Sequence, residues 1–379
     1  MPLDINVYIE RTTGFWTVQG AQLVTDIIAK VKAERITPDQ LEAFIRAELQ
    51  RMGYRDLVKK TLAEAITASA AYGIGAVAIS APARKWLLEK AVNADGLKFS
   101  ARVNNLARTE EMVDYIKIAL KKGEGLKMAA QHLSDKGIQS ADVAKGIQEL
   151  THAARQAAAA ADDPLIAQNV RIAARQAQRA VNRLVDPDKS KLRRAYQDVI
   201  DTAETSKIKA IEKAAQYAAV YKERYNAERI IATESARAYG KGFFSNIADD
   251  DDIVGWRSVL NSAHKTTDIC DFWASVDLFG MGPGCFPKGK APDYPYHPFC
   301  ACTLRPIIAG DIEAKKKPIP ENAIEYLQKL PQQSQTQLLG KAGAESFSEN
   351  PDQWTDYLKN YTPPKKITGL IPGSVLHGE

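Results

Sequence analysis

The sequence lacks several of the signals that would place it in a familiar class. Its 379 residues hold only four cysteines and five histidines. No glycine-rich phosphate-binding loop, dinucleotide fingerprint or nucleophile elbow is found, so three common kinds of active site have no sequence support. Residues 1–6 do not pair a basic stretch with a following apolar one, and we therefore expect no secretory signal.

Long apolar runs are also missing. The most apolar window, residues 68–83, is rich in small side chains and contains Gly73, Gly75 and Pro82. It is shorter than the ~20 residues that a membrane span needs. We interpret it as the buried end of a helix followed by a turn, and we expect no contact with a membrane.

Aromatic residues make up 8% of the chain and hydrophobic residues 45%. This balance permits a buried core but favours helices that meet through small side chains. The net charge of +5 and the pI of about 8.8 indicate an anionic partner only weakly. Four cysteines in a chain of this length do not make a disulfide scaffold, and in a reducing compartment clustered cysteines are metal ligands or free thiols.

Helix signals dominate the first two thirds of the chain. Residues 37–40, Thr-Pro-Asp-Gln, have the pattern of a capping box with proline at the first helical position, and predict a helix that ends near Gly53. Two further helices are predicted over residues 54–72 and around Trp86, the latter ending by Gly96. Others are predicted from Ser100 to Gly123, between there and Gly137, over 140–161, and after each of the Asp-Pro pairs that begin at residues 163 and 186.

Glycine and proline are absent between Asp188 and Tyr239. A single helix of that length exceeds the usual range of globular proteins, so the run predicts a spine, a coiled-coil-like arm, or two helices joined by a break. We expect the helix to end at Gly240 and Gly242.

Arginines recur at four-residue spacing after the first Asp-Pro pair. They lie along one face of the predicted helix, while Val170, Val181 and Leu184 are available for packing on the other side. This face is either simply solvated or a ridge that contacts the phosphates of double-stranded DNA without sequence preference. The ridge consists of Arg171, Arg175, Arg179 and Arg183.

Strand signals begin after residues 249–252, four consecutive aspartates. We expect these to form an exposed loop, because the ligand spacing of a calcium loop is missing. Residues 253–260 and 300–308 predict two strands of a small sheet, with a loop rich in glycine and proline between them. A linker is predicted at 315–318, two short helices around Gly340, and an extended or mobile tail over 363–379.

These patterns predict a mostly α protein with a small α+β C-terminal domain, in which an elongated helical body leads through a long helix into a small sheet. The predicted parts are an N-terminal arm (1–36, with a short helix over 21–33 as the alternative), a helical body (37–185), an α+β domain (186–310), and a linker with a C-terminal tail (311–379).

All the cysteines lie between residues 270 and 302. Cys300 and Cys302 are two apart, so on a strand both thiols point to the same side, and His297 can turn back toward them. With a further soft ligand from one of the two earlier cysteines, this set suits a tetrahedral zinc ion. Free buried thiols are the competing interpretation, and disulfides come last. The candidate zinc ligands are Cys270, Cys285, His297, Cys300 and Cys302.

A catalytic interpretation would need a Cys–His dyad built on His297 or His264. The sequence marks neither an oxyanion hole nor a third, orienting residue. We therefore expect no enzyme activity and no catalytic residue.

An ordered series of landmarks runs through residues 229–308. Its members are Arg229, Thr233, Glu234, Trp256, His264, Asp268, Cys270, and the closing His297-Pro-x-Cys300-x-Cys302. The series covers roughly a fifth of the chain and resembles the phage Mu F-like family, the minor head or head morphogenesis proteins of tailed phages. The closing motif is its most specific part. Family members commonly carry arginine where this chain has Ala301, and a second cysteine soon after the first, where this chain has Asp271-Phe-Trp.

The resemblance implies a minor capsid protein in the interior of the head or at the portal vertex of a virion, assembled in the host cytoplasm. It would act in head assembly and in DNA packaging or ejection, with the portal protein and the major capsid protein as partners. Read from the residues alone, Thr233 and Glu234 predict a helix-end hydrogen bond and an ion pair with Arg229 or Arg237, rather than a catalytic glutamate.

Two other functions compete with this one. The arginine ridge favours an internal virion protein that binds DNA non-specifically. A toxin-like or Cys-dependent enzyme is the second alternative, and residues 309–379 count against it because they are too short and polar for an added catalytic domain.

Overall fold

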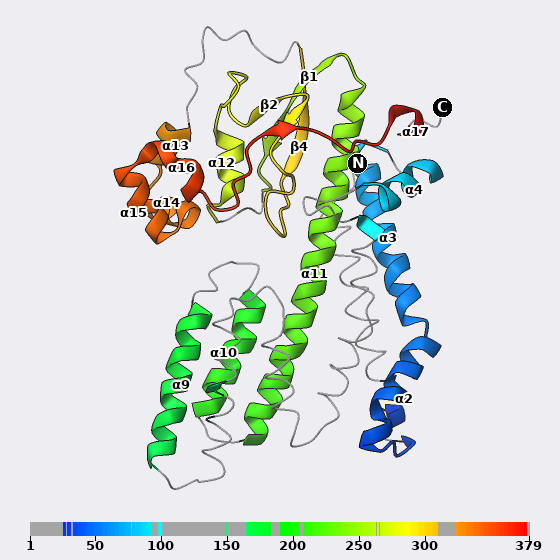
Figure 1. The fold of residues 1–379 in the computed structure, drawn as a ribbon, viewed down its shortest axis with the longest axis vertical. Helices are drawn as coiled ribbons and strands as arrows, with labels where there is room; N and C mark the ends of the chain where they lie inside the picture. Colours follow the sequence, from blue (N-terminus) through cyan, green and yellow to red (C-terminus); the bar gives the residue numbers. More distant parts are fainter. Residues whose placement is uncertain are drawn as a thin grey trace. The chain divides into compact units, whose positions relative to one another are not determined.

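The computed structural model describes residues 26–27, 29–31, 33–76, 78–91, 98–100, 149–150, 153, 164–182, 190–204, 208–262, 264, 266–309 and 323–376. These residues are mostly helical, with two small antiparallel sheets in the C-terminal part of the chain (Figure 1). The predicted fold class, mostly α with a small α+β region, is confirmed. The helices predicted over 100–137, most of that over 140–161, the linker at 315–318, and Arg183 lie outside the described residues.

The chain divides into two compact units. One consists of Met1–Thr12, Lys60–Asn104 and Ile230–Glu379, and the other of Thr13–Lys59 and Asn105–Arg229. The helices up to residue 248 are α2 (Pro38–Arg51), α3 (Tyr54–Gly73), α4 (Ala81–Glu89), α9 (Pro164–Asn182), α10 (Ser190–Glu204) and α11 (Ile208–Ala248). None of the described helices is long and apolar enough to cross a membrane.

Local signals place the helix starts. Thr37 and Gln40 form the predicted capping box at the start of α2, and Ser80 caps α4 by accepting a hydrogen bond from the backbone N–H of Ala83 at 3.2 Å. The apolar window at 68–83 is the end of α3 and the turn into α4, as predicted.

Helices α9 and α10 pack through small side chains. Gln178 and Gln197 exchange two side-chain hydrogen bonds of 2.7 and 2.6 Å between them. Most of the other buried side chains of this helix pair are aliphatic, as the composition predicts, with Tyr196 of α10 buried among them. The buried alanines are Ala173, Ala174, Ala177 and Ala180 on α9 and Ala195 and Ala203 on α10.

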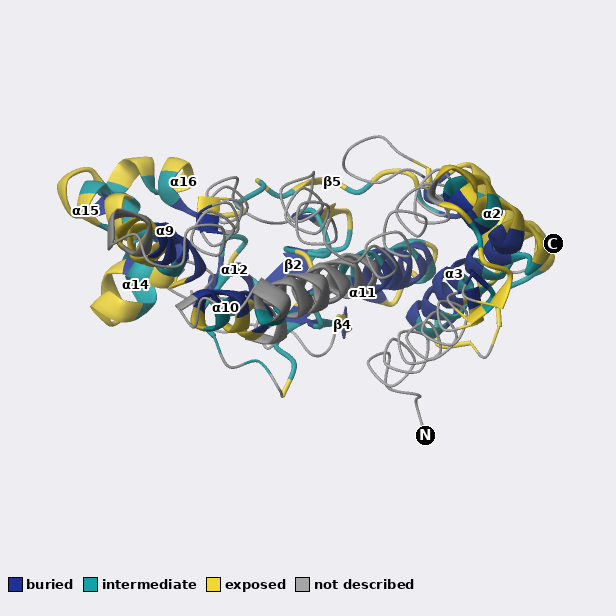
Figure 2. Ribbon diagram, turned by 90° about the horizontal axis from the view of Figure 1, so that it is seen from below, coloured by how far each residue is buried: buried dark blue, intermediate teal, exposed yellow. Residues whose placement is uncertain are grey.

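The predicted end of α11 at Gly240 and Gly242 is wrong, because the helix continues to Ala248. These glycines serve close packing instead. A Cβ atom on Gly242 would lie 2.2 Å from the carbonyl oxygen of Ala70, and one on Gly240 would lie 2.5 Å from the ring of Tyr294. Gly73 of α3 makes the reciprocal approach to α11, since its Cβ would lie 2.2 Å from the carbonyl oxygen of Tyr239. Figure 2 shows the buried, dark-blue parts of both helices.

The larger sheet has the order β2-β1-β4, with antiparallel pairing on both sides of β1. Its strands are β1 (Ile253–Val259), β2 (Cys285–Pro287) and β4 (Thr303–Ile308). Trp256, at the centre of β1, is fully buried and stacks on Phe286 with ring centroids 4.4 Å apart. The aspartates at 249–252 are exposed, as predicted.

Short helices follow the sheet. They are α12 (Ile269–Ser275), α13 (Ala323–Lys329), α14 (Gln332–Leu339), α15 (Lys341–Glu349), the 3-10 turn η2 (Pro351–Gln353) and α16 (Trp354–Tyr357). The two helices predicted around Gly340 are α14 and α15, and Gly340 joins them with φ +80°. Phe272 of α12 is fully buried against the rings of Tyr326, Trp354 and Tyr361.

The described part of the C-terminal tail folds onto the rest of its unit, where we expected an extended or mobile segment. Strand β5 (Lys365–Lys366) pairs with β3 (Lys290–Ala291), and α17 (Gly373–Leu376) follows. Ile371 is buried, and its backbone N–H donates to Ser245 Oγ of α11 at 2.9 Å. The buried apolar residues of this segment are Ile371 and Leu376. They are too far apart to form a periodic pattern in the sequence.

Candidate metal centre

Cys270 lies in the first turn of α12. A capping box formed by Asp268 and Asp271 stabilises this turn. Asp268 Oδ1 accepts a hydrogen bond from the backbone N–H of Cys270 at 2.7 Å, and Asp271 Oδ2 accepts one from the backbone N–H of Asp268 at 2.8 Å. His264 Nε2 lies 2.8 Å from the same oxygen of Asp271. The backbone that carries the thiol is therefore held in place by side chains on both sides of it.

Cys300 is positioned by a turn rather than by a strand. Its backbone N–H donates to the carbonyl of His297 at 3.2 Å, and Phe299 within the turn has φ +62°. The backbone N–H of Phe299 donates to Thr233 Oγ1 on α11 at 3.4 Å. The predicted second strand is confirmed as β4, but it starts at Thr303 rather than at residue 300, because this turn comes first.

Three thiols meet at this point. The Sγ atoms of Cys270, Cys300 and Cys302 all lie within 4.8 Å of one another, and Cys270 Sγ is 3.7 Å from Cys300 Sγ. A tetrahedral zinc ion with Zn–S bonds of about 2.3 Å separates its sulfur ligands by about 3.8 Å. The side chains are 0%, 3% and 3% exposed, so the cluster is sealed from solvent and can hold a metal ion.

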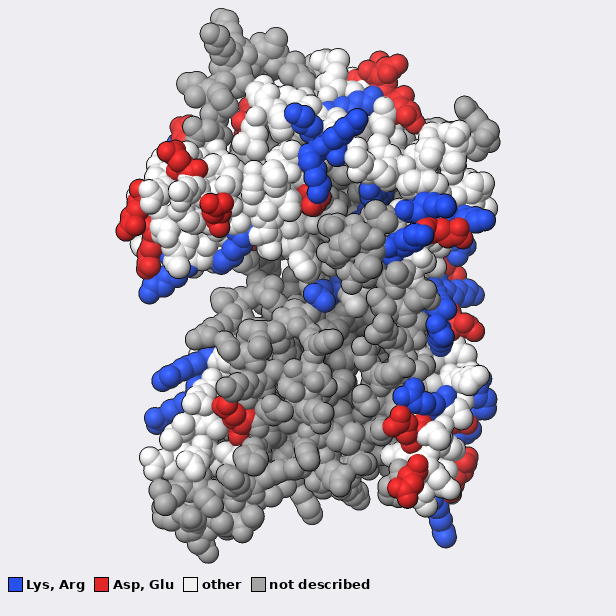
Figure 3. Space-filling view, in the orientation of Figure 1, with Lys and Arg blue, Asp and Glu red and all other residues white. Residues whose placement is uncertain are grey.

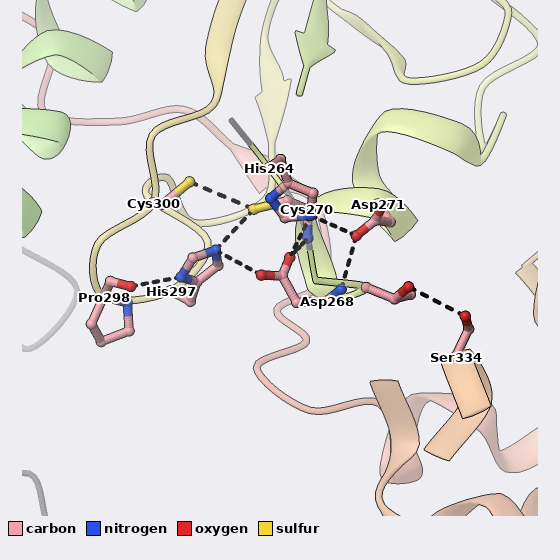
Figure 4. Close-up of polar contacts among 9 residues, drawn as sticks. His264, Asp268, Cys270, Asp271, His297, Pro298, Cys300 and Ser334 are labelled. Carbon is pink, nitrogen blue, oxygen red and sulfur yellow. Dashed lines mark hydrogen bonds and ion pairs between the residues drawn. The ribbon is translucent and has the colours of Figure 1, made fainter. Parts of the chain in front are cut away.

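His297 lies beside one of the three thiols, that of Cys270, and groups with it and Asp268 (Figure 4). Its Nε2 lies 3.0 Å from Cys270 Sγ and 3.3 Å from Asp268 Oδ2. Its Nδ1 lies 2.6 Å from the carbonyl oxygen of Pro298, which accepts a proton carried on that nitrogen. This tautomer leaves the lone pair of Nε2 facing the thiols, which is how a backbone carbonyl commonly orients a metal-binding histidine.

The thiols influence one another's ionisation. Burial, together with hydrogen bonding to Cys300 and Cys302, raises the pKa of Cys270 well above its usual range. Hydrogen bonds from Cys270 and Cys302 hold the pKa of Cys300 well below its usual range. Because metal binding requires deprotonated thiols, a bound cation would favour the thiolate form at this cluster.

Cys285, the other candidate ligand, lies outside this cluster. It is on β2, and its Sγ is 3.5 Å from the carbonyl oxygen of Pro283. Burial raises its pKa. Of the two earlier cysteines, the structure therefore brings only Cys270 to Cys300 and Cys302.

The remaining landmarks surround the cluster or belong to the core. Glu234 is buried and pairs with Arg237 at 3.6 Å, so one of the two predicted partners is confirmed. Thr233 does not cap a helix end, because it lies inside α11 and accepts from the turn at Phe299. Trp256 lies in the same hydrophobic core as the thiols, and its indole N–H donates to the carbonyl of Lys290 at 2.9 Å.

Sequence reasoning missed Asp271, Tyr294 and Asn261. The Asp-x-x-Asp spacing before α12 was a readable capping signal. Tyr294 donates through its hydroxyl to the carbonyl of Cys302 at 2.6 Å, and Asn261 donates to the carbonyl of Ala301 at 3.2 Å. No local pattern marks these two residues, because their partners are tertiary.

The arginine ridge forms a separate candidate surface on α9. Arg171, Arg175 and Arg179 are exposed, while Val170 and Val181 are buried on the other side of the helix, as predicted.

No family model, curated protein or solved structure matches the chain.

Proposed function

We propose that this chain is a minor head protein of a tailed phage, of the Mu F-like kind, acting inside the head or at the portal vertex in head assembly and in DNA packaging or ejection. The supporting observation is the convergence of landmarks that are distant in the sequence. Thr233 of α11 holds the turn that presents Cys300, Asp268 holds the backbone of Cys270, and His297 lies beside the Cys270 thiol.

The cluster supports a structural role better than a catalytic one. A nucleophilic cysteine needs a thiolate that its substrate can reach, and the three thiols here are at most 3% exposed. The residues instead join three segments: α12, the turn before β4, and α11 through Thr233.

Zinc is the metal that this donor set fits best. Cys270, Cys300 and Cys302 would supply three thiolates, and His297, beside Cys270, is the candidate fourth ligand of a closed structural zinc site. Protein purified without chelator is expected to carry close to one zinc per chain by inductively coupled plasma mass spectrometry. Cys270→Ser should lose that zinc and Cys285→Ser should keep it. A metal-free preparation of full stability would remove the zinc proposal and leave the virion proposal standing.

Purified virions test the larger proposal. Virions of the phage that encodes the chain should contain its peptides by mass spectrometry, at a lower copy number than the major capsid protein. Cryo-electron microscopy of the head should place it next to the portal protein or against the inner face of the capsid shell. Virions that yield portal and capsid peptides but none from this chain would contradict a virion location.

Replacing a thiol of the cluster by an imidazole distinguishes a structural role of the cluster from a catalytic one. Cys302→His keeps a nitrogen ligand for zinc while removing a thiol, so a structural site should retain metal and support the formation of infectious heads. Metal content is measured on the same preparation. A variant that binds zinc, folds and yet fails in complementation would favour the Cys-dependent enzyme.

A further inference from the structure

Helix α9 exposes three arginines along one face. Arg171, Arg175 and Arg179 are all exposed, and none of them forms an ion pair with another of the residues that the structure describes. The other side of the helix is buried. Basic side chains project over the α9 region at the lower left of Figure 3.

Residues 164–182 contain no aspartate or glutamate. On other described helices, some exposed basic side chains pair with an acidic residue three or four positions away. Arg46 pairs with Glu42 at 3.0 Å, and Lys329 pairs with Glu325 at 2.9 Å. Such pairs stabilise a solvated helix. Helix α9 has three arginines and no acidic residue, so it lacks such ion pairs. Its arginines, spaced four residues apart, also repel one another.

We infer that Arg171, Arg175 and Arg179 form a binding surface for the phosphate backbone of double-stranded DNA. The helical rise places successive guanidinium groups about 6 Å apart along the axis, a spacing that suits a linear array of phosphates. Arginine binds phosphate through two parallel N–H donors. This inference concerns a different unit from the metal centre and does not depend on the virion proposal.

The rest of the exposed face points to binding without sequence preference. Gln168, Asn169 and Gln176 are exposed beside the arginines, and amide side chains donate readily to phosphate oxygens. The exposed apolar side chain on this face, Ile172, is 46% exposed. No described aromatic ring lies on α9 to stack on a base, so the surface fits a duplex backbone better than unpaired bases.

The salt dependence of binding is the deciding measurement. Each phosphate contact adds about 0.9 to the slope of log affinity against log salt for duplex DNA. Three contacts therefore contribute a slope of about 2.7, or about 40-fold in affinity between 50 and 200 mM salt. Full-length protein is titrated with a 30-base-pair duplex of arbitrary sequence, followed by fluorescence anisotropy. Substituting all three arginines by glutamine should reduce the slope by about 2.7, while a triple lysine variant should keep it.

A second triple variant serves as the control for net charge. Arg84→Gln, Lys85→Gln and Lys90→Gln remove the same charge from exposed positions of α4 and of the residue after it and should leave the slope within about 0.5 of wild type. Glutamine is a good helix former and these positions are exposed, so all variants should fold. An equal loss of slope in both glutamine variants would overturn the inference. An absence of duplex binding at low salt would also overturn it. If polyglutamate bound instead of DNA, the partner of the three arginines would be an acidic protein.

Discussion

Replacing Cys270 by serine should abolish the dependence of stability on zinc. The thiol lies at the centre of the cluster, with Cys300 Sγ at 3.7 Å and His297 Nε2 at 3.0 Å. A serine hydroxyl is a poor zinc ligand, so the variant would keep at most three ligands. The exchange removes one sulfur atom from a buried site and alters no charge on the surface.

The size of the effect follows from linkage. A ligand that binds only the folded state stabilises it by about 4.1 kcal/mol when its free concentration is a thousand times its dissociation constant. For a unit of the order of 200 residues, each kcal/mol moves the melting temperature by about 2–4 °C. Wild-type protein in buffered free zinc should therefore melt about 8–16 °C higher than after metal removal.

Thermal unfolding followed by circular dichroism measures this shift in three proteins. Cys285→Ser is the matched control, because it makes the same exchange at a buried cysteine outside the cluster. It should melt somewhat lower than wild type but rise equally with zinc, whereas Cys270→Ser should not respond. The reasoning is refuted if zinc leaves the wild-type melting temperature unchanged, or if both variants respond alike.

Three further measurements examine the scaffold. Gly242→Ala should lower the free energy of unfolding by about 2 kcal/mol in denaturant titrations, despite alanine's higher helix propensity, because its Cβ would lie 2.2 Å from the Ala70 carbonyl oxygen. Gly289→Ala, with no atom within 4 Å of the added carbon, should be nearly neutral, and similar losses in both would contradict the packing account. Tyr239→Phe should cost about 1–3 kcal/mol, because the Tyr239 hydroxyl both accepts from and donates to the backbone of Leu304. Burial raises the pKa of Tyr239 to about 12. The folded protein therefore keeps a proton that the unfolded chain loses near pH 10, and wild-type stability should fall by up to about 1.4 kcal/mol per pH unit between pH 10 and 12. The phenylalanine variant should show a shallower fall over that interval, and parallel curves would exclude this role of Tyr239.

Signals that act within a few residues predicted the helices well. The capping box at Thr37 and the strand at 253–260 each depend on neighbouring residues, and both were found. Gly240 and Gly242 misled because a glycine has two uses that the sequence does not distinguish. It ends a helix when the backbone needs a positive φ, and it admits a second backbone when a partner helix comes close.

The candidate site was predicted in its residue types but not in its geometry. Cysteine and histidine at metal-ligand spacing drew attention to residues 270–302, and the structure unites Cys270 with Cys300 and Cys302. The sequence could not decide between Cys270 and Cys285, since that choice depends on how α12 and β2 pack. The hydrogen bonds from Tyr294 and Asn261 to the backbone around Cys302 could not be predicted either. Every residue has a backbone carbonyl, so the sequence does not show which carbonyl accepts.

The last strand and helix of the tail have a consequence for biosynthesis. Lys366 pairs with Lys290, Ile371 bonds to Ser245, and Ser80 Oγ donates to the carbonyl of Val375 at 2.9 Å. Residues near 80, 245, 290 and 375 thus complete one unit. On the ribosome these contacts cannot form until the segment around residue 375 has emerged, so the unit closes only after all four segments have been synthesised.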